Sequence, residues 1–210
     1  MNRMRMVVVA ACVAVMCCVA AGENIDPQNE GAQHAWGENV GWLNFEPSAG
    51  PGVQVSGDKV TGFVWGENIG WISLSCENTA SCEKVNFGVI NDGAGNLSGF
   101  AWGENVGWIN FRPRVPGDAT QYGVRIGGDG RFDGWAWGEN IGWIRFDGRK
   151  PYTVRACVVT LEDLANFANE WLAAGTSPAN LDGGRNVDLG DFSRFAGYWL
   201  DFCPDGWQLK

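Results

Sequence analysis

Residues 34–146 alternate short stretches of β-branched and aromatic residues with glycine-rich turns. The last unit shows the pattern most fully: residues 122–126 (YGVRI) are followed by Gly-Gly-Asp-Gly, then by residues 131–137 (RFDGWAW), Gly-Glu-Asn, and residues 141–146 (IGWIRF). Alternating side chains around a Gly-Asp-Gly turn are typical of antiparallel hairpins. Similar parts occur earlier, at residues 52–58 and 87–93. The pattern predicts repeated three-stranded meanders.

One heptapeptide, WGENVGW or WGENIGW, occurs four times and contains eight of the twelve tryptophans. Its copies begin at Trp36, Trp65, Trp102 and Trp137, and only the fifth residue varies, between Val and Ile. Successive copies start 29, 37 and 35 residues apart. A repeat of this length indicates a supersecondary unit that buries its faces only against its neighbours.

The order of the repeated parts suggests that the units form a ring. Nothing like YGVRI precedes the first copy, whereas residues 152–156 (YTVRA) follow the fourth copy and resemble the missing strand. Exchange of one strand between the chain ends would close the sheet and remove its open edges. We therefore expect residues 34–156 to form a mainly β domain, a closed four-bladed propeller-like ring. A β-barrel and an open stack of meanders are the alternatives.

Alternation along the last strand of each unit separates two faces. One face is apolar in every copy and is expected to form the core: Leu43 and Phe45, Ile72 and Leu74, Ile109 and Phe111, Ile144 and Phe146. The other face carries Ile141, Trp143 and Arg145, with Asn44, Ser73 and Asn110 in place of the arginine in the other copies. If the hairpin loop has two or four residues, Trp137 lies opposite Gly142 and the first tryptophans share the core face. A three-residue loop would break this register.

The Glu-Asn pairs of the motif are expected to be turn residues: Glu38 and Asn39, Glu67 and Asn68, Glu104 and Asn105, Glu139 and Asn140. Asn tolerates a left-handed backbone, and Glu would bond to backbone amides or to an indole N–H. Alternatively, these side chains bind cations or sugar hydroxyls. Catalysis is not expected, because general acid–base chemistry needs carboxyls in different environments and the repeat gives four similar ones.

The second tryptophan of each copy is a candidate ligand platform: Trp42, Trp71, Trp108 and Trp143. Indole rings beside Asn, Ser or Arg suit stacking against sugar rings, and repeated sites would add avidity. The alternative is that neighbouring units cover these rings, since exposed apolar patches are uncommon without a purpose.

A helical period replaces the alternation after Thr160. Apolar residues follow an i, i+3, i+4, i+7, i+8 pattern twice, 28 residues apart: Leu164, Phe167, Ala168, Trp171 and Leu172, then Phe192, Phe195, Ala196, Trp199 and Leu200. Two amphipathic helices of about ten residues cannot fold alone, so we expect them to pack on each other.

Residues 1–21 have the pattern of an export signal, with a basic start, an apolar run and small residues before Gly22. The apolar run is shorter than a membrane-spanning helix needs, and an uncleaved anchor or lipoprotein processing at Cys12 are the alternatives. Residues 22–33 form a polar leader.

Four cysteines lie beyond the signal segment: Cys76, Cys82, Cys157 and Cys203. An even number in an exported chain favours disulfides. We expect pairing within each region, Cys76 with Cys82 in a short polar insertion and Cys157 with Cys203 around the helical segment.

A net charge of −9 without any basic stripe argues against nucleic acid or an anionic membrane surface as a partner. His34 is the only histidine, and no His or Cys cluster has the spacing of a transition-metal site. The sequence contains no nucleophile elbow, Walker loop or dinucleotide fingerprint. These features favour a protein that is not an enzyme.

Residues 180–191 have the oxygen-ligand spacing of a calcium loop. Candidate ligands occupy positions 1, 3, 7, 9 and 12: Asn180, Asp182, Asn186, Asp188 and Asp191. The loop departs from the pattern at position 5, which is Gly184, and at position 6, where Arg185 replaces the usual glycine. The alternative is that the loop only caps the following helix.

With its duplicated helices, each ending in Trp-Leu, the module at residues 157–210 resembles the dockerin-like and EF-hand-like modules of secreted bacterial proteins, particularly those of planctomycetes. The resemblance implies docking or surface attachment and one weak Ca²⁺ site. Leu161-Glu162 and Leu189-Gly190 replace the small hydroxyl pairs that recognise cohesin, so cohesin is not implied as the partner. The tryptophan repeats resemble WGENxGW repeats of other exported prokaryotic proteins, whose activity is unknown.

Together these patterns favour an exported protein, secreted or at the cell surface, that binds or scaffolds without catalysis. The C-terminal module would attach it to an extracellular protein or glycan, and the repeated tryptophans would bind carbohydrate. A purely structural surface protein is the alternative, and a glycan-active enzyme comes third.

Overall fold

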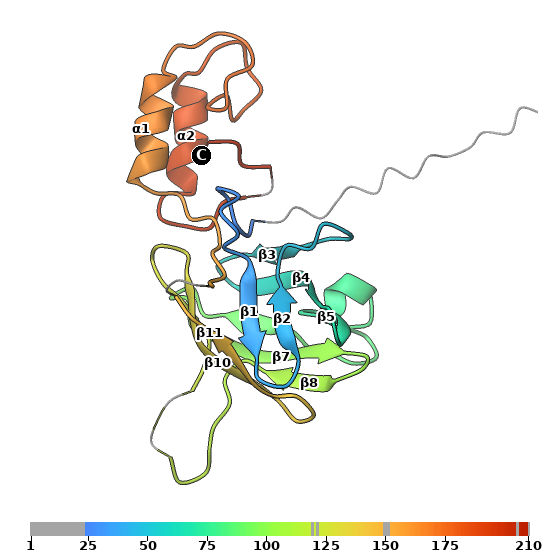
Figure 1. Ribbon diagram of the computed structural model, residues 1–210. Helices are drawn as coiled ribbons and strands as arrows, with labels where there is room; N and C mark the ends of the chain where they lie inside the picture. The colour runs from blue at the N-terminus through green and yellow to red at the C-terminus, as the bar shows by residue number, and fades with distance from the viewer. Residues whose placement is uncertain (1–23, 119, 121, 149–151, 205, 210) are drawn as a thin grey trace, which may run out of the picture.

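A computed structural model describes residues 24–118, 120, 122–148, 152–204 and 206–209. The expected export signal at residues 1–21 lies outside these ranges. Figure 1 shows a β domain with a small helical module beyond one of its ends.

Four β-hairpins, one for each copy of the heptapeptide, form the wall of the β domain (Figure 1). Their strands are β1 (His34–Gly37) and β2 (Gly41–Asn44), β4 (Lys59–Gly66) and β5 (Gly70–Ser73), β7 (Leu97–Gly103) and β8 (Gly107–Asn110), β10 (Phe132–Gly138) and β11 (Gly142–Phe146). Each hairpin pairs antiparallel with the next, and β1 pairs with β11. The chain therefore closes into an eight-stranded antiparallel barrel. Pairing between hairpins makes one continuous sheet in place of the four separate blades of the propeller that we expected.

Three short strands extend the barrel at the end opposite the hairpin turns: β3 (Val53–Val55), β6 (Val89–Asn91) and β9 (Arg125–Ile126). Each pairs with the first half of the long strand that follows it. The last three repeats are thus three-stranded meanders, as the sequence predicts. In the first repeat, residues 152–156 occupy this place, because Val154 bridges Gln33 while Arg155 bridges Arg131 of the fourth repeat.

Each long strand (β4, β7 and β10) bends at a glycine. Its first part pairs with a short strand and its second part with the barrel wall. Gly62, Gly99 and Gly134 have φ of 93°, 85° and 104°. A Cβ on Gly62 would lie 1.9 Å from the carbonyl oxygen of Gly52, and the other two glycines approach a backbone carbonyl equally closely. Only glycine fits this combination of positive φ and close backbone contact.

The hairpins turn through three residues, which changes the register expected for the tryptophans. In the first hairpin Gly37 lies opposite Gly41 and Trp36 opposite Trp42, and the other hairpins repeat this pairing. The prediction that each tryptophan covers a cross-strand glycine is therefore wrong. The first tryptophans lie on the outer face, not on the core face. The left-handed residue is the sixth of the motif, Gly41 with φ of 80°, and not the asparagine.

The variable fifth residue of the motif closes one end of the barrel. Val40, Ile69, Val106 and Ile141 are all buried. Ile141 had been expected on the outer face, but the left-handed glycine after it redirects the chain and turns it inward. We call these four side chains the plug. A Cβ on the second residue of each motif would lie 2.4–2.6 Å from the plug side chain of the same motif, so only glycine leaves room for it.

Four asparagine side chains link the hairpin turns into a closed ring. In each case Asn Nδ2 donates to the carbonyl oxygen of the fifth motif residue in the preceding hairpin: Asn68 to Val40 (3.0 Å), Asn105 to Ile69 (3.0 Å), Asn140 to Val106 (3.1 Å) and Asn39 to Ile141 (3.1 Å). The last bond joins the two ends of the repeat region. Asparagine thus connects neighbouring repeats, which accounts for its presence in every copy.

The predicted core face of the last strands is confirmed. Leu43, Phe45 and their counterparts in the other three repeats are at most 3% exposed. Phe146 contacts Phe45 and Phe132 with ring centroids 5.5 and 5.9 Å apart. The centre of the barrel is therefore filled by side chains.

Both predicted disulfides are present, Cys76–Cys82 and Cys157–Cys203. The first closes the insertion after β5, which contains a single 3₁₀ turn, η1 (Cys76–Thr79). Two disulfides suggest an oxidising, extracellular environment. Among the described residues, none of the helices has the length and apolar character needed to cross a bilayer.

The helical module consists of α1 (Leu161–Asn169) and α2 (Leu189–Gly197), each starting with a capping box. The helices pack on each other as predicted, with Phe167 and Phe195 buried and their ring centroids 5.2 Å apart. Both helices end earlier than the periodicity suggests. Leu172 and Leu200 follow the last turn with positive φ and are 69% and 67% exposed. Of the two predicted apolar stripes, only Phe167 and Phe195 are fully buried.

The side chain of Asn24 connects the barrel with the module. Its Nδ2 donates to the carbonyl oxygens of Val55 (2.9 Å) and Cys203 (3.0 Å), and its Oδ1 accepts from Val55 N (2.8 Å). The residue is buried, so these bonds are shielded from water.

Replacing the bend glycine, Gly62→Ala, should lower the free energy of unfolding by about 2–4 kcal/mol, because it adds both a strained φ and a backbone clash. Gly128→Ala is the control, since this turn glycine has no atom within 4 Å of a new Cβ. Chemical denaturation followed by tryptophan fluorescence measures both. Equal stability of the two variants would show that the bend does not depend on glycine.

Candidate functional site

The eight motif tryptophans form a belt around the outside of the barrel, near its plugged end. We call this set the tryptophan belt: Trp36, Trp42, Trp65, Trp71, Trp102, Trp108, Trp137 and Trp143. The two rings of each hairpin meet edge to face, with centroids 4.6–4.9 Å apart and interplanar angles of 60–72°. Such pairs stabilise a hairpin beyond the area they bury. The belt therefore supports the barrel wall and also presents aromatic surface.

The second tryptophans differ in how far they are covered. Trp42 and Trp71 are 44% and 38% exposed. Trp108 is partly covered by Phe87 and Phe100, at 5.3 and 6.2 Å between centroids. Trp143 likewise contacts Tyr122 and Trp135. Aromatic residues of the same repeat thus cover part of Trp108 and Trp143, whereas Trp42 and Trp71 remain more open to solvent.

A polar residue lies directly across the strand pair from each first tryptophan. The pairs are Asn44 with Trp65, Ser73 with Trp102, Asn110 with Trp137 and Arg145 with Trp36. These are the polar positions that the alternation placed on the outer face. Their side chains are engaged within the protein: Asn44, Ser73 and Asn110 form hydrogen bonds, and Arg145 pairs with Asp147.

A glutamate stands beside the second tryptophan of each preceding hairpin. Glu38 shows the arrangement, because its backbone N–H donates to the carbonyl oxygen of Trp143 at 3.2 Å. The side chains of Glu38, Glu67, Glu104 and Glu139 are exposed. Across the described ranges none of these carboxylates has a hydrogen bond or an ion pair, so the expected bond to an amide or an indole is not observed.

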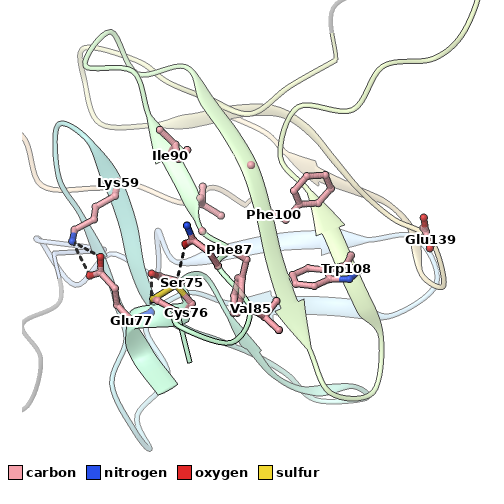
Figure 2. A pocket seen from close by; sticks show the side chains of 15 residues that line it. Lys59, Ser75, Cys76, Glu77, Val85, Phe87, Ile90, Phe100, Trp108 and Glu139 are labelled. Atoms are coloured by element: carbon pink, nitrogen blue, oxygen red, sulfur yellow. Dashed lines mark hydrogen bonds and ion pairs between the residues drawn. A yellow bond between two sulfur atoms is a disulfide. The ribbon is translucent and has the colours of Figure 1, made fainter. Parts of the chain in front are cut away.

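Two grooves open along the belt. The smaller, of about 360 Å³, lies between β5 and β7 and is lined by Phe63, Trp71, Ser73, Thr79, Trp102 and Glu104. The larger, of about 780 Å³, lies beside Trp108 and is bounded by the Cys76–Cys82 insertion (Figure 2). Figure 2 shows an ion pair between Lys59 and Glu77 on one side of this groove and Glu139 on the other. The hydrogen bond to Glu77 raises the pKa of Lys59, so the lysine is charged and already neutralised.

The predicted calcium ligands lie together before α2. Asp182, Asp188 and Asp191 bring carboxylate oxygens within 4.8 Å of one another, and this is the one such group among the described residues. The Oδ1 atom of Asn180 is buried and has no hydrogen-bond partner, although its Nδ2 donates to two carbonyl oxygens. Asn186 bridges Ala174 through its backbone, and its side chain is exposed.

Asp191 holds the calcium-loop segment together. Its two oxygens accept hydrogen bonds from the backbone N–H groups of Asp182 and Asp188, both at 2.9 Å. Burial raises the pKa of the Asp191 carboxyl, but these backbone N–H groups lower it further, and the net pKa lies below its ordinary value. The group is therefore ionised at neutral pH. The left-handed residue of the calcium-loop segment is Gly183, with φ of 76°, so position 6 of the loop does not need a glycine and can be Arg185.

No protein-family model matches the chain, and no curated protein or solved structure is significantly similar to it. The resemblances of the C-terminal module and of the tryptophan repeats therefore remain predictions.

Sequence reasoning did not anticipate two parts of the site. It placed the first tryptophans on the core face, whereas they lie on the outer face, because the length of the hairpin loop determines the side to which they point. It also missed Phe87, Phe100 and Tyr122, which come from outside the heptapeptide and border the belt. Their only sequence signal is an aromatic residue near the leading strand (Phe87, Tyr122) or on the long strand (Phe100) of a repeat, which is too general to indicate a groove.

Proposed function

We propose that this is an exported, non-catalytic protein that binds carbohydrate through the tryptophan belt. The observation that carries the proposal is the groove between β5 and β7, where Trp71 and Trp102 lie beside Ser73 and Glu104. Indole rings stack on the apolar faces of sugars, and the exposed carboxylate of Glu104 matches sugar hydroxyls. Ligand sites of this kind are concave and mostly apolar, with a few polar groups that orient the ligand.

The repeated grooves favour binding over a purely structural role. Indole rings that served only to stabilise hairpins would not need to remain exposed, whereas Trp42 and Trp71 are 44% and 38% exposed. Individually weak sites around one rigid body also give avidity for a polymer. In this proposal the C-terminal module attaches the barrel to an extracellular partner or surface.

Replacing Trp71 and Trp108 by Ala should weaken glycan binding at least about tenfold, since each change removes an aromatic stacking surface. The control is Trp171→Ala, which removes a comparably exposed ring (41%) from the helical module. A glycan array followed by titration of the best ligand measures all three proteins. Absence of any glycan binding by the unmodified protein would contradict the carbohydrate proposal and favour a structural role.

We further propose one weak Ca²⁺ site before α2. The buried, unpartnered Oδ1 of Asn180 supports it, because an uncompensated buried oxygen is unfavourable and a cation would satisfy it. Asp182, Asp188 and Asp191 supply the carboxylate oxygens that a hard cation prefers.

Calorimetry on the full chain should show Ca²⁺ binding with a Kd of about 0.1–1 mM, as in weak extracellular sites. The heat should disappear in Asp182→Ala and persist in Asp133→Ala, which removes an exposed carboxylate from the barrel. Equal heats from the two variants would refute the site and leave helix capping as the role of the loop.

A further inference from the structure

The four motif glutamates are the residues of the heptapeptide that the barrel itself does not explain. The tryptophans pair, the glycines make room, the aliphatic residue plugs the barrel and the asparagine bonds to the next hairpin. The glutamate side chains make no bond within the described part of the chain and are exposed. Fold stability therefore does not account for a carboxylate at this position in all four copies.

Strand register places each of these glutamates next to a tryptophan of the preceding hairpin. The register that places Leu43 opposite Gly66 puts Trp42 beside Glu67 one residue further along, and the same offset puts Trp71 beside Glu104 and Trp108 beside Glu139. An ammonium group is attracted both to the face of an indole ring and to a carboxylate. A neutral hydroxyl would gain much less from the negative charge.

No positive side chain in the described part of the chain forms an ion pair with a motif glutamate. Lys59 is held by Glu77 at 2.7 Å, on the side of the larger groove away from Glu139 (Figure 2). Arg145 pairs with Asp147 at 2.9 Å and lies over the ring of Trp135. The overall charge of −9 adds to the negative potential of the belt. Charge complementarity therefore points to a cationic ligand.

We propose that the grooves bind protonated amino sugars, with the ammonium group between a glutamate and an indole ring and the sugar ring stacked on the second tryptophan. This inference rests on the proposed carbohydrate binding and narrows its substrate class to cationic glycans.

The test compares two β-1,4-linked trisaccharides of equal length, glucosamine and its fully N-acetylated form, at pH 5.5, where the amines are protonated. We expect the cationic trisaccharide to bind about tenfold more tightly, because only it carries the charge that the carboxylates recognise. In Glu104→Gln/Glu139→Gln the affinity for the cationic trisaccharide should fall about tenfold, to that of the N-acetylated form, since both grooves lose their carboxylate. Glu30→Gln/Glu162→Gln changes the net charge equally, at exposed positions outside the belt, and should bind like the unmodified protein.

Equal affinity for the two trisaccharides, or full binding by the Glu104/Glu139 variant, would overturn the inference. The carbohydrate proposal would then still stand if the N-acetylated trisaccharide lost affinity in Trp71→Ala. Trilysine is the third probe. If it competes as well as the cationic trisaccharide, the belt recognises ammonium groups without the sugar, and the assignment to amino sugars is wrong.

Discussion

Closure of the repeats by asparagine is the interaction on which the rest of the barrel depends. Each asparagine bonds to the preceding hairpin, so four identical turns can form a ring only if the last turn meets the first, as Asn39 does with Ile141. The register that makes these bonds also buries the fifth residue and faces the two tryptophans of a hairpin toward each other. One register per repeat thus gives the asparagine bond, the buried fifth residue and the outward-facing tryptophan pair.

The same constraint separates the motif into structural and free positions. Residues that form the ring, the plug and the aromatic pairs cannot change without disturbing a neighbour. The glutamate carboxylate and the outer faces of the rings remain available for a ligand. Because every hairpin has this division, the barrel presents its aromatic and acidic groups four times around one axis, while the helical module stays at the opposite end (Figure 1).

Much of the fold follows from the local sequence. The alternation of Leu43 and Phe45 predicts the core face, the turns rich in Gly and Asp predict the meanders, and the position of residues 152–156 predicts that the ends meet. The expected propeller is wrong and its alternative, the barrel, is what forms, because pairing between hairpins depends on long-range register that the local sequence does not contain. A single residue of loop length moved Trp137 from the core face to the surface, since side chains alternate along a strand. The helix ends at Asn169 and Gly197 were missed because periodicity does not register the left-handed residues after them.

The most direct measurement compares the stabilities of Asn39→Ala and Glu38→Gln, two neighbouring residues of the same turn. Asn39→Ala should lower the free energy of unfolding by about 1 kcal/mol, because it breaks the bond that joins the last hairpin to the first. Glu38→Gln should change it by less than about 0.5 kcal/mol, as expected of a side chain without partners in the barrel. A loss of stability in Glu38→Gln as large as that in Asn39→Ala would show that the glutamate serves the fold, and would contradict its assignment to a ligand.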